Sequence, residues 1–154
     1  MMEIRIRPAV PADAERMEEL YRLMRKAIYG PADQKGYEAG YLDRFFGPGG
    51  NRAYVVEAAG RTVAFISLEE HRGEPEPFVY VDDISVEPAL RGQGIGQRLL
   101  DLAEEYAAER GIAQLRLHVE DSNAGARRLY ERNGYREFRM TGSRHLLRKR
   151  LGPA

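Results

Sequence analysis

The chain of 154 residues contains no cysteine. This absence excludes disulfides, thiolate metal ligands and a covalent cysteine intermediate. No stretch reaches the ~20 consecutive apolar residues of a membrane span, and the first residues lack the apolar segment of a signal peptide. The chain also has no excess of positive or negative charge, because 24 basic residues balance 24 acidic ones. A nucleic-acid-binding protein with a basic surface all round is therefore not expected.

What is present is ordinary for a soluble globular protein, with 43% hydrophobic and 31% charged residues. The length suits one domain with its own core, and no repeat or linker interrupts it. We therefore expect residues 1–154 to form a single domain. The lack of cysteine suits a reducing compartment such as the cytoplasm. Neither a membrane nor a nucleic acid is expected as a partner, and a homodimer stays open.

Hydrophobic periods of two and of 3.6 residues divide the chain into strands and helices. The unit from residue 78 to 120 reads as strand, helix, strand, which predicts a right-handed parallel crossover. Short turns elsewhere predict antiparallel hairpins. We expect an α/β fold, with a mixed, mostly antiparallel sheet and helices on both faces. The predicted strands cover residues 3–7, 53–58, 62–69, 78–86, 114–120, 135–140 and 144–150, and the predicted helices cover about 13–29, 34–46, 97–110 and 123–132.

A glycine-rich loop between a strand and a helix, residues 91–96 (RGQGIG), is the strongest chemical signal. Glycines allow tight turns and close approach of a ligand to backbone amides, and a helix start presents unpaired N–H groups to an anion. The spacing G-x-G-x-G differs from the dinucleotide fingerprint, and the Lys-Ser/Thr of a Walker loop is missing. A diphosphate site and a turn that only joins strand to helix both fit this pattern.

The loop resembles the acetyl-CoA-binding motif of the GNAT superfamily of N-acetyltransferases, Gln/Arg-x-x-Gly-x-Gly/Ala, which Arg91, Gly94 and Gly96 match. Residues 84–88 (ISVEP) resemble the stretch that precedes it in that family. A second family motif, Asn-x-x-Ala-x-x-Leu-Tyr-x-x-x-Gly-Phe/Tyr, resembles residues 123–135 at the expected separation. The resemblance is strong over residues 78–135, and elsewhere it rests on the order of the elements.

The resemblance implies a GNAT-like acyltransferase fold and direct transfer of the acetyl group of acetyl-CoA to a primary amine in a ternary complex. It implies that the backbone of Ile84 and Val86 pairs with the pantetheine arm, which would lie along the strand like a further strand. It also implies that Tyr130 protonates the CoA thiolate. The residues that we expect to bind acetyl-CoA are Ile84, Ser85, Val86, Arg91, Gly92, Gln93, Gly94, Ile95, Gly96, Gln97, Asn123 and Tyr130.

Two adjacent acids, Asp82 and Asp83, interrupt an otherwise apolar strand. Burial of such groups is costly unless they are solvated, hydrogen-bonded or functional, and a bulge there would explain the broken alternation. An amine must lose its proton before it attacks a thioester, and a carboxylate can accept that proton directly or through water. We expect Asp82 or Asp83 to be catalytic, with Glu120, Glu69 or water as other candidates for the base. Acids that merely solvate a wet cleft remain an alternative.

The acceptor is expected between the N-terminal helices and the loops 47–50 and 71–77. No cluster of His, Asp and Glu has the spacing of metal ligands, so we expect no metal. A non-catalytic acyl-CoA sensor and an unrelated nucleotide-binding domain remain the alternatives to an enzyme. Aromatic residues that could line the acceptor site, or belong to the core, are Tyr29, Tyr37, Tyr41, Phe46 and Tyr54. His118 alternates with apolar neighbours and is interpreted as a strand-face residue rather than a base.

Overall fold

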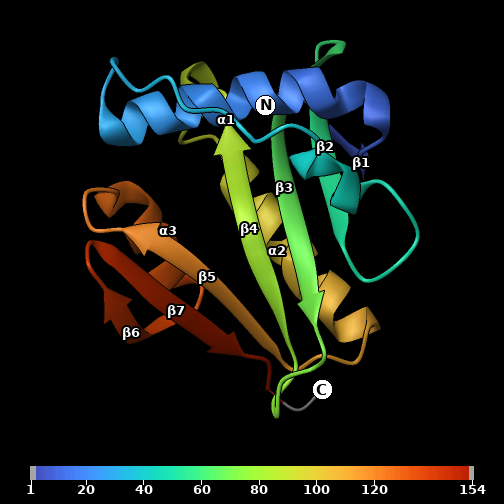
Figure 1. The fold of residues 1–154 in the computed structure, drawn as a ribbon, viewed down its shortest axis with the longest axis vertical. Helices are drawn as coiled ribbons and strands as arrows, with labels where there is room; N and C mark the ends of the chain where they lie inside the picture. Colours follow the sequence, from blue (N-terminus) through green and yellow to red (C-terminus); the bar gives the residue numbers. More distant parts are fainter. Residues whose placement is uncertain (1–2, 153–154) are drawn as a thin grey trace.

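A computed structural model describes residues 3–152 (Figure 1). No helix in this range is long and apolar enough to cross a bilayer. The strands are β1 (Arg5–Pro8), β2 (Arg52–Ala58), β3 (Arg61–His71), β4 (Phe78–Val86), β5 (Gln114–Glu120), β6 (Arg136–Thr141) and β7 (Arg144–Arg150). The helices are α1 (Ala14–Tyr29), α2 (Ile95–Glu109) and α3 (Ala124–Arg132), with 3₁₀ turns η1 (Pro11–Asp13), η2 (Tyr41–Phe45) and η3 (Pro88–Leu90).

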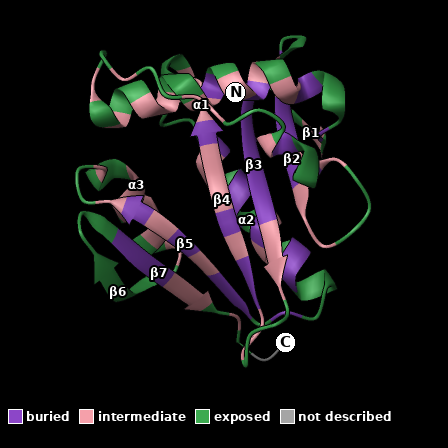
Figure 2. Ribbon diagram, in the orientation of Figure 1, coloured by how far each residue is buried: buried purple, intermediate pink, exposed green. Residues whose placement is uncertain are grey.

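All seven strands form one sheet in the order β1-β2-β3-β4-β5-β7-β6. Only β4 and β5 are parallel, as the crossover through α2 requires. Helix α1 covers one face of the sheet, where Met17 and Leu20 pack with Phe65 in one core. Helices α2 and α3 belong to the other face, whose larger core contains Leu99 and Leu117 (Figure 2). The predicted fold class, with helices on both faces of a mostly antiparallel sheet, is confirmed.

The predicted helix over residues 34–46 is wrong. This segment is an extended loop that ends in the short turn η2, and Gly40 within it has a φ of 75°, which a right-handed helix does not allow. The spacing of four between Tyr37 and Tyr41 has another cause. Their rings stack on each other with centroids 5.0 Å apart, and Tyr37 also stacks on Tyr21 of α1 at 4.0 Å.

Strands β4 and β5 separate part of the way along their length. Their pairing covers only Val79–Val81 against Leu115–Leu117, although β4 stays paired with β3 as far as Val86. Asp82 has no partner on β3, because Val81 pairs with Leu68 and Asp83 pairs with Ser67. The expected bulge is therefore present, and it lies where the sheet opens. The edge of β4 that faces this opening has no neighbouring strand.

Candidate active site

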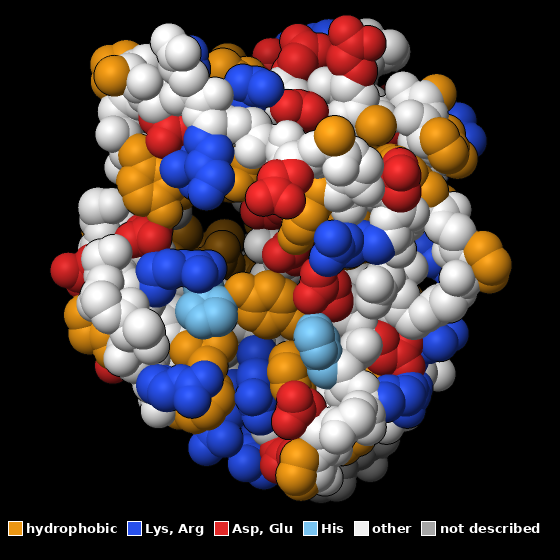
Figure 3. Space-filling model, in the orientation of Figure 1, with side chains coloured by type: hydrophobic (Ala, Val, Ile, Leu, Met, Phe, Trp, Pro, Cys, Tyr) orange, Lys and Arg blue, Asp and Glu red, His pale blue; other side chains and the backbone are white. Residues whose placement is uncertain are grey.

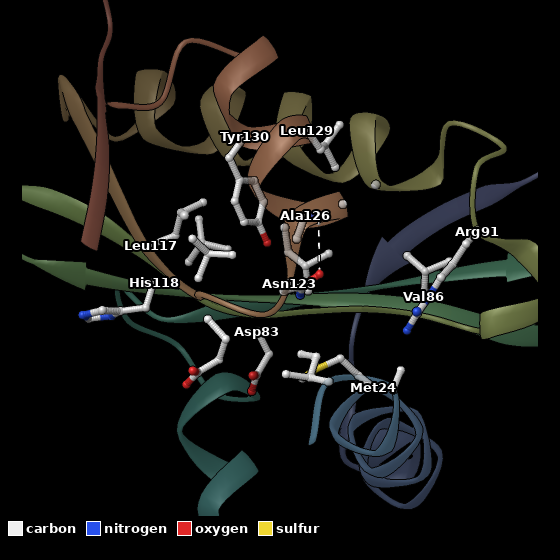
Figure 4. Close-up of a pocket in the computed structure, with 18 of the residues that line it drawn as sticks. Met24, Asp83, Val86, Arg91, Leu117, His118, Asn123, Ala126, Leu129 and Tyr130 are labelled. Atoms are coloured by element: carbon white, nitrogen blue, oxygen red, sulfur yellow. Dashed lines mark hydrogen bonds between the residues drawn. The ribbon is translucent and has the colours of Figure 1, made fainter. Parts of the chain in front are cut away.

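The opening between β4 and β5 is part of a cleft with a volume of about 1010 Å³. Figure 4 shows that Tyr130 enters it from the α3 side of the sheet, whereas Asp83 and Met24 lie on the α1 side. In Figure 3 the same region is a hollow with carboxylates on one side. Of the predicted site residues, the structure brings together Asp82, Asp83, Ile84, Val86, Arg91, Gly92, Gly94, Ile95, Gly96, Gln97, Asn123 and Tyr130.

Two predicted site residues do not line this cleft. Ser85 alternates with Ile84 and Val86, so its side chain points to the other face of β4, where the residue is only 1% exposed. Gln93 is exposed on the outside of the glycine loop. The sequence prediction selected every residue of 84–86 and of 91–97, whereas only some residues of each segment face the cleft.

The glycine loop needs its glycines because of its backbone conformation. Gly92 and Gly94 have φ values of 77° and 85°, in the left-handed region, and a Cβ at either position would meet nothing within 4 Å. Crowding therefore plays no part, and the open space beside both residues is available to a ligand. The first N–H groups of α2, which begins at Ile95, have no intrahelical partners, so the loop and helix start can hold an anion.

Gly96 and Gln97 hold α2 close to α3. A Cβ at Gly96 would lie 3.2 Å from Leu129 Cδ2, so a larger residue there would force the Leu129 side chain to shift by a few tenths of an ångström. The amide of Gln97 donates to Asn133 Oδ1 at 2.6 Å, and the amide of Asn133 donates back to Gln97 Oε1 at 2.9 Å. Sequence analysis assigned Gln97 to the ligand and missed its partnership with Asn133. This amide pair fixes the end of α3 against the start of α2.

Asn123 and Tyr130 are both on the α3 side of the cleft. Asn123 caps the helix, because its Oδ1 accepts the N–H of Ala126 at 3.3 Å (Figure 4). The ring of Tyr130 packs against the larger core and lies 6.0 Å from the ring of Tyr135. Burial raises the pKa of Tyr130 to about 12, and Asp83 adds to this rise. The hydroxyl is therefore protonated at neutral pH.

Two tyrosines of the loop between α1 and β2 hold the adjacent acids of β4. Tyr37 donates to Asp83 Oδ2 at 2.7 Å, and Tyr41 donates to Asp82 Oδ2 at 2.5 Å. Because of the bulge, both neighbouring carboxylates reach the same loop, although neighbours in a regular strand point to opposite faces. The Asp83 N–H donates to the buried Ser67 hydroxyl at 3.2 Å, which helps to fix the bulge.

Burial, followed by the nearby charge of Asp82, raises the pKa of Asp83 to about 7. The Tyr37 hydrogen bond acts in the opposite direction, because it stabilises the carboxylate. Burial also raises the pKa of Asp82, which the Tyr41 hydroxyl partly offsets. Burial and the Asp83 charge raise the pKa of Tyr37 well above its usual range, so this tyrosine remains a donor. An acid of this kind can take up and release a proton near neutral pH.

The other predicted bases are already engaged. Glu120 accepts hydrogen bonds from Tyr29 at 2.7 Å and from Ser143 at 2.8 Å. Its partial burial favours a higher pKa, but these bonds and Arg144 outweigh it, so the pKa of Glu120 is lowered. Glu69 faces the His71 imidazole at 3.1 Å and the Arg44 guanidinium at 3.9 Å.

The acceptor end of the cleft differs from the sequence prediction. No residue of the loops 47–50 and 71–77 lines the cleft. Of the five aromatic residues considered for it, only Tyr29 lines it, whereas Tyr37, Tyr41, Phe46 and Tyr54 do not. Helix α1 lines it, as expected for the first N-terminal helix, and the Tyr29–Glu120 hydrogen bond joins the end of α1 to β5 across the cleft. His118 also lines it, where burial lowers the pKa of this histidine, and Tyr80 contacts its Nδ1 at 2.5 Å. Residues 3–152 contain no group of three His, Cys, Asp or Glu side chains placed to hold a metal.

Comparison with known proteins agrees with this geometry. The model of the acetyltransferase (GNAT) family matches residues 17–135. The uncharacterized N-acetyltransferase YhfO of Bacillus subtilis is 32% identical over 134 residues, which cover 86% of this chain and 89% of that protein. Thialysine N-epsilon-acetyltransferase of Sus scrofa is 40% identical over 73 residues, but these span only 43% of its length.

Solved structures show the same fold. The PaiA N-acetyltransferase of Thermoplasma acidophilum, in complex with coenzyme A, superposes with a TM-score of 0.78 at 21% identity and covers 97% of this chain and 99% of that one. The family match includes both motifs, the glycine loop and the segment of Asn123 and Tyr130. The chain belongs to the GNAT family of acetyltransferases.

Proposed function

We propose that this acetyltransferase moves the acetyl group of acetyl-CoA to a primary amine by direct attack in a ternary complex. The observation that carries the proposal is the opening between β4 and β5. It has the glycine loop at one end, and Tyr130 and Asp83 reach it from opposite sides of the sheet. The amine nitrogen forms a bond to the thioester carbon, the carbon–sulfur bond breaks, and coenzyme A leaves. Neither a sensor without turnover nor an unrelated nucleotide-binding domain is favoured by the family match.

The fit of acetyl-CoA rests on three features of the chain. The left-handed Gly92 and Gly94 leave free space beside the N-terminus of α2, where the diphosphate would be held by backbone amides. Arg91 lines the same end of the cleft and adds positive charge. The unpaired edge of β4 between Asp82 and Val86 can hydrogen-bond to the amides of the pantetheine arm.

Among the candidate bases we propose Asp83. Its pKa of about 7 places it between carboxylate and acid at the pH of the cell, which is the condition for efficient proton transfer. One of its oxygens accepts the Tyr37 hydroxyl, and the residue lines the cleft, where an amine or a bridging water would meet it. Asp82 then contributes the like charge that raises the pKa of Asp83. Glu120 fits less well, because its pKa is lowered and its carboxylate is already bonded.

Tyr130 is proposed to give its proton to the thiolate of coenzyme A. Its hydroxyl points into the cleft from the side opposite Asp83, so acid and base act on opposite sides of the sheet (Figure 4). A backbone N–H at the open edge of β4, at Ile84 or Val86, would stabilise the oxyanion of the tetrahedral intermediate.

The test is release of free thiol from acetyl-CoA in the presence of a broad set of amines. We expect turnover with at least one class of amine, and loss of turnover with retained acetyl-CoA binding in the Asp83→Asn and Tyr130→Phe variants. Tyr21→Phe is the matched control, because Tyr21 lines the cleft and the hydrogen bonds to Asp82 and Asp83 come from Tyr41 and Tyr37. Full turnover by Asp83→Asn would refute the assignment of the base.

We further propose that residues 1–154 act as one domain, that the protein works in the cytoplasm without a metal, and that a homodimer is compatible with the cleft. The composition without cysteine supports the compartment. The strands β1 to β7 form a single sheet with one hydrophobic core on each face, which supports the domain assignment. Fractionation of cells and light scattering of the purified protein test these points.

A further inference from the structure

Among residues 3–152, no helix covers the front face of β5, β7 and β6 in Figure 1, and this face carries arginines. On β5, Leu117 points into the core shared with α2 and α3, so the alternate residues Arg116 and His118 point away from it. Arg116 lies directly opposite Arg148 of β7. Figure 3 shows basic side chains gathered over these strands, below the hollow. We call Arg116, Arg139 and Arg148 the arginine face.

Two guanidinium groups of the arginine face, those of Arg116 and Arg148, are held by aromatic rings. Arg116 lies 4.0 Å from the ring centroid of Phe78 and 5.1 Å from that of Phe138, and Arg148 lies 4.4 Å from Phe138. Stacking covers the flat side of a guanidinium and leaves its N–H edge to hydrogen-bond partners. In Arg116 the Nε–H donates to Gln114 Oε1 at 2.5 Å, so its terminal NH₂ groups are the ones that a ligand can use. Such an edge donates two parallel hydrogen bonds to one carboxylate. The rings therefore hold these arginines in an orientation that suits an anionic ligand.

The positive charges of the arginine face are not neutralised within the described part of the chain. No carboxylate of residues 3–152 lies within 4.0 Å of Arg116, Arg139 or Arg148. Burial, followed by the repulsion of Arg148, lowers the pKa of Arg116, against an opposing effect of Glu76. Glu76 is itself bonded to the Gln114 amide and lies 3.2 Å from Arg150. Like charges directly opposite each other on two strands are unfavourable, and a bound anion would remove that cost.

The arginine face adjoins the acceptor end of the cleft. His118 and Arg144 line the cleft, and the charge of Arg139 contributes to the lowered pKa of His118. The family match ends at residue 135, so it does not account for Phe138, Arg139 and Arg148. A molecule whose amine reached Asp83 would therefore pass beside these arginines.

We propose that the arginine face binds acidic side chains of a polypeptide acceptor, an inference that rests on the proposed function. The cleft presents two signs of charge in succession, the carboxylates of Asp82 and Asp83 and then the arginines. A peptide can match this order, with an amine first and carboxylates after it, whereas the carboxylates would repel a continuous polyphosphate. From Glu120 at the cleft to Arg116 β5 extends about 13 Å, so the acids would lie about three to four positions from the acetylated residue.

The test uses two short synthetic peptides that carry one lysine. One has two glutamates three and four positions after the lysine, and its twin has glutamines there. We expect the glutamate peptide to bind about tenfold more tightly in a fluorescence anisotropy titration. Arg139→Glu and Arg148→Gln should each remove most of that preference, because each removes a positive charge of the arginine face. Arg139 is exposed, so its replacement leaves the core intact. Arg5→Glu on β1, at the opposite edge of the sheet, is the matched control and should keep it.

Equal binding of the two peptides, or a preference that survives both substitutions, would overturn the inference. Stronger competition by a single-stranded RNA than by the glutamate peptide would overturn the choice of an acidic polypeptide. The titration needs no turnover, so it separates this inference from the proposed function. Arginine-dependent binding without thiol release from any amine would refute the acetylation step alone. If both peptides bound with equal affinity and were acetylated at equal rates, only the role of the arginine face would be refuted.

Discussion

The hydrogen bond from Tyr37 to Asp83 leads to a quantitative prediction for the Tyr37→Phe variant. The substitution removes the 2.7 Å bond that stabilises the charged form of Asp83 and keeps the ring that stacks on Tyr21 and Tyr41. Loss of a donor that favours the carboxylate must raise the pKa of the acid. The acidic limb of kcat/KM against pH, which reports a base that must be ionised, should therefore move to higher pH.

The size of the shift follows from the strength of such a bond. A hydrogen bond to a charged group contributes about 1.5–3 kcal/mol, and one pKa unit corresponds to about 1.4 kcal/mol. Water that enters the vacated position would replace part of the bond, so a shift of about one unit is expected. The limb should move from about 7 toward about 8, given the pKa of about 7 for Asp83.

The assay is thiol release at limiting amine from pH 5.5 to 9.5, with one amine for all variants. The ionisation of the amine itself then contributes identically to each profile. Tyr21→Phe is the control, because it changes the same ring stack without touching a carboxylate. A Tyr37→Phe profile that is lower but unshifted would refute the reasoning. An unshifted profile together with full activity of Asp83→Asn would instead move the base elsewhere.

Three further changes have expected outcomes. Tyr130→Phe should lower kcat at least tenfold and leave the Kd of acetyl-CoA within twofold, measured by calorimetry, and an unchanged kcat would reduce this residue to a packing role. Gly94→Asp should weaken acetyl-CoA binding at least tenfold and lower stability by about 1–2 kcal/mol, because it strains a backbone with a φ of 85° and puts a negative charge beside the diphosphate. His145 lies 2.9 Å from Asp121 and also contacts Glu137. The hydrogen bond to Asp121, followed by that to Glu137, raises the pKa of His145. The protonated imidazole therefore stabilises the fold fully below the ordinary pKa of histidine, about 6.5, and this stabilisation is lost as the pH rises through the raised pKa. The Tm of His145→Gln should therefore fall less than that of the parent protein between pH 6 and pH 8.5, and parallel Tm curves would contradict this.

The sequence predicted most strands and three helices because their patterns are local. Strand β4 was expected at residues 78–86 and is found at Phe78–Val86, and the bulge was expected at its two acids. The error at residues 34–46 arose because two stacked tyrosines four residues apart imitate the period of a helix. No single segment contains the information that corrects it. The hydroxyls of Tyr37 and Tyr41 find their partners on β4, more than 40 residues further along the chain.

The arginine face was equally invisible in the sequence. It combines β5, β6 and β7 with Phe78 from β4. Strand β6 is exposed along its whole length and has a bulge between Glu137 and Arg139, so its sequence does not show which side chains share a side. Discrimination among the bases also needed the structure. Asp83 and Glu120 are both carboxylates in the sequence. Burial and the neighbouring Asp82 charge raise the pKa of Asp83 to about 7, whereas two hydrogen bonds and Arg144 lower the pKa of the less buried Glu120.

The reciprocal amide pair of Gln97 and Asn133 has a consequence for how the enzyme would fail on heating. It joins the turn that would grip the coenzyme to the helix that carries Tyr130, and Asn133 additionally donates to the Leu129 carbonyl at 2.8 Å. These two parts therefore belong to one cooperative block. As the temperature rises, affinity for the coenzyme and the capacity to protonate its thiolate should vanish together, without a partly melted species that keeps one and has lost the other.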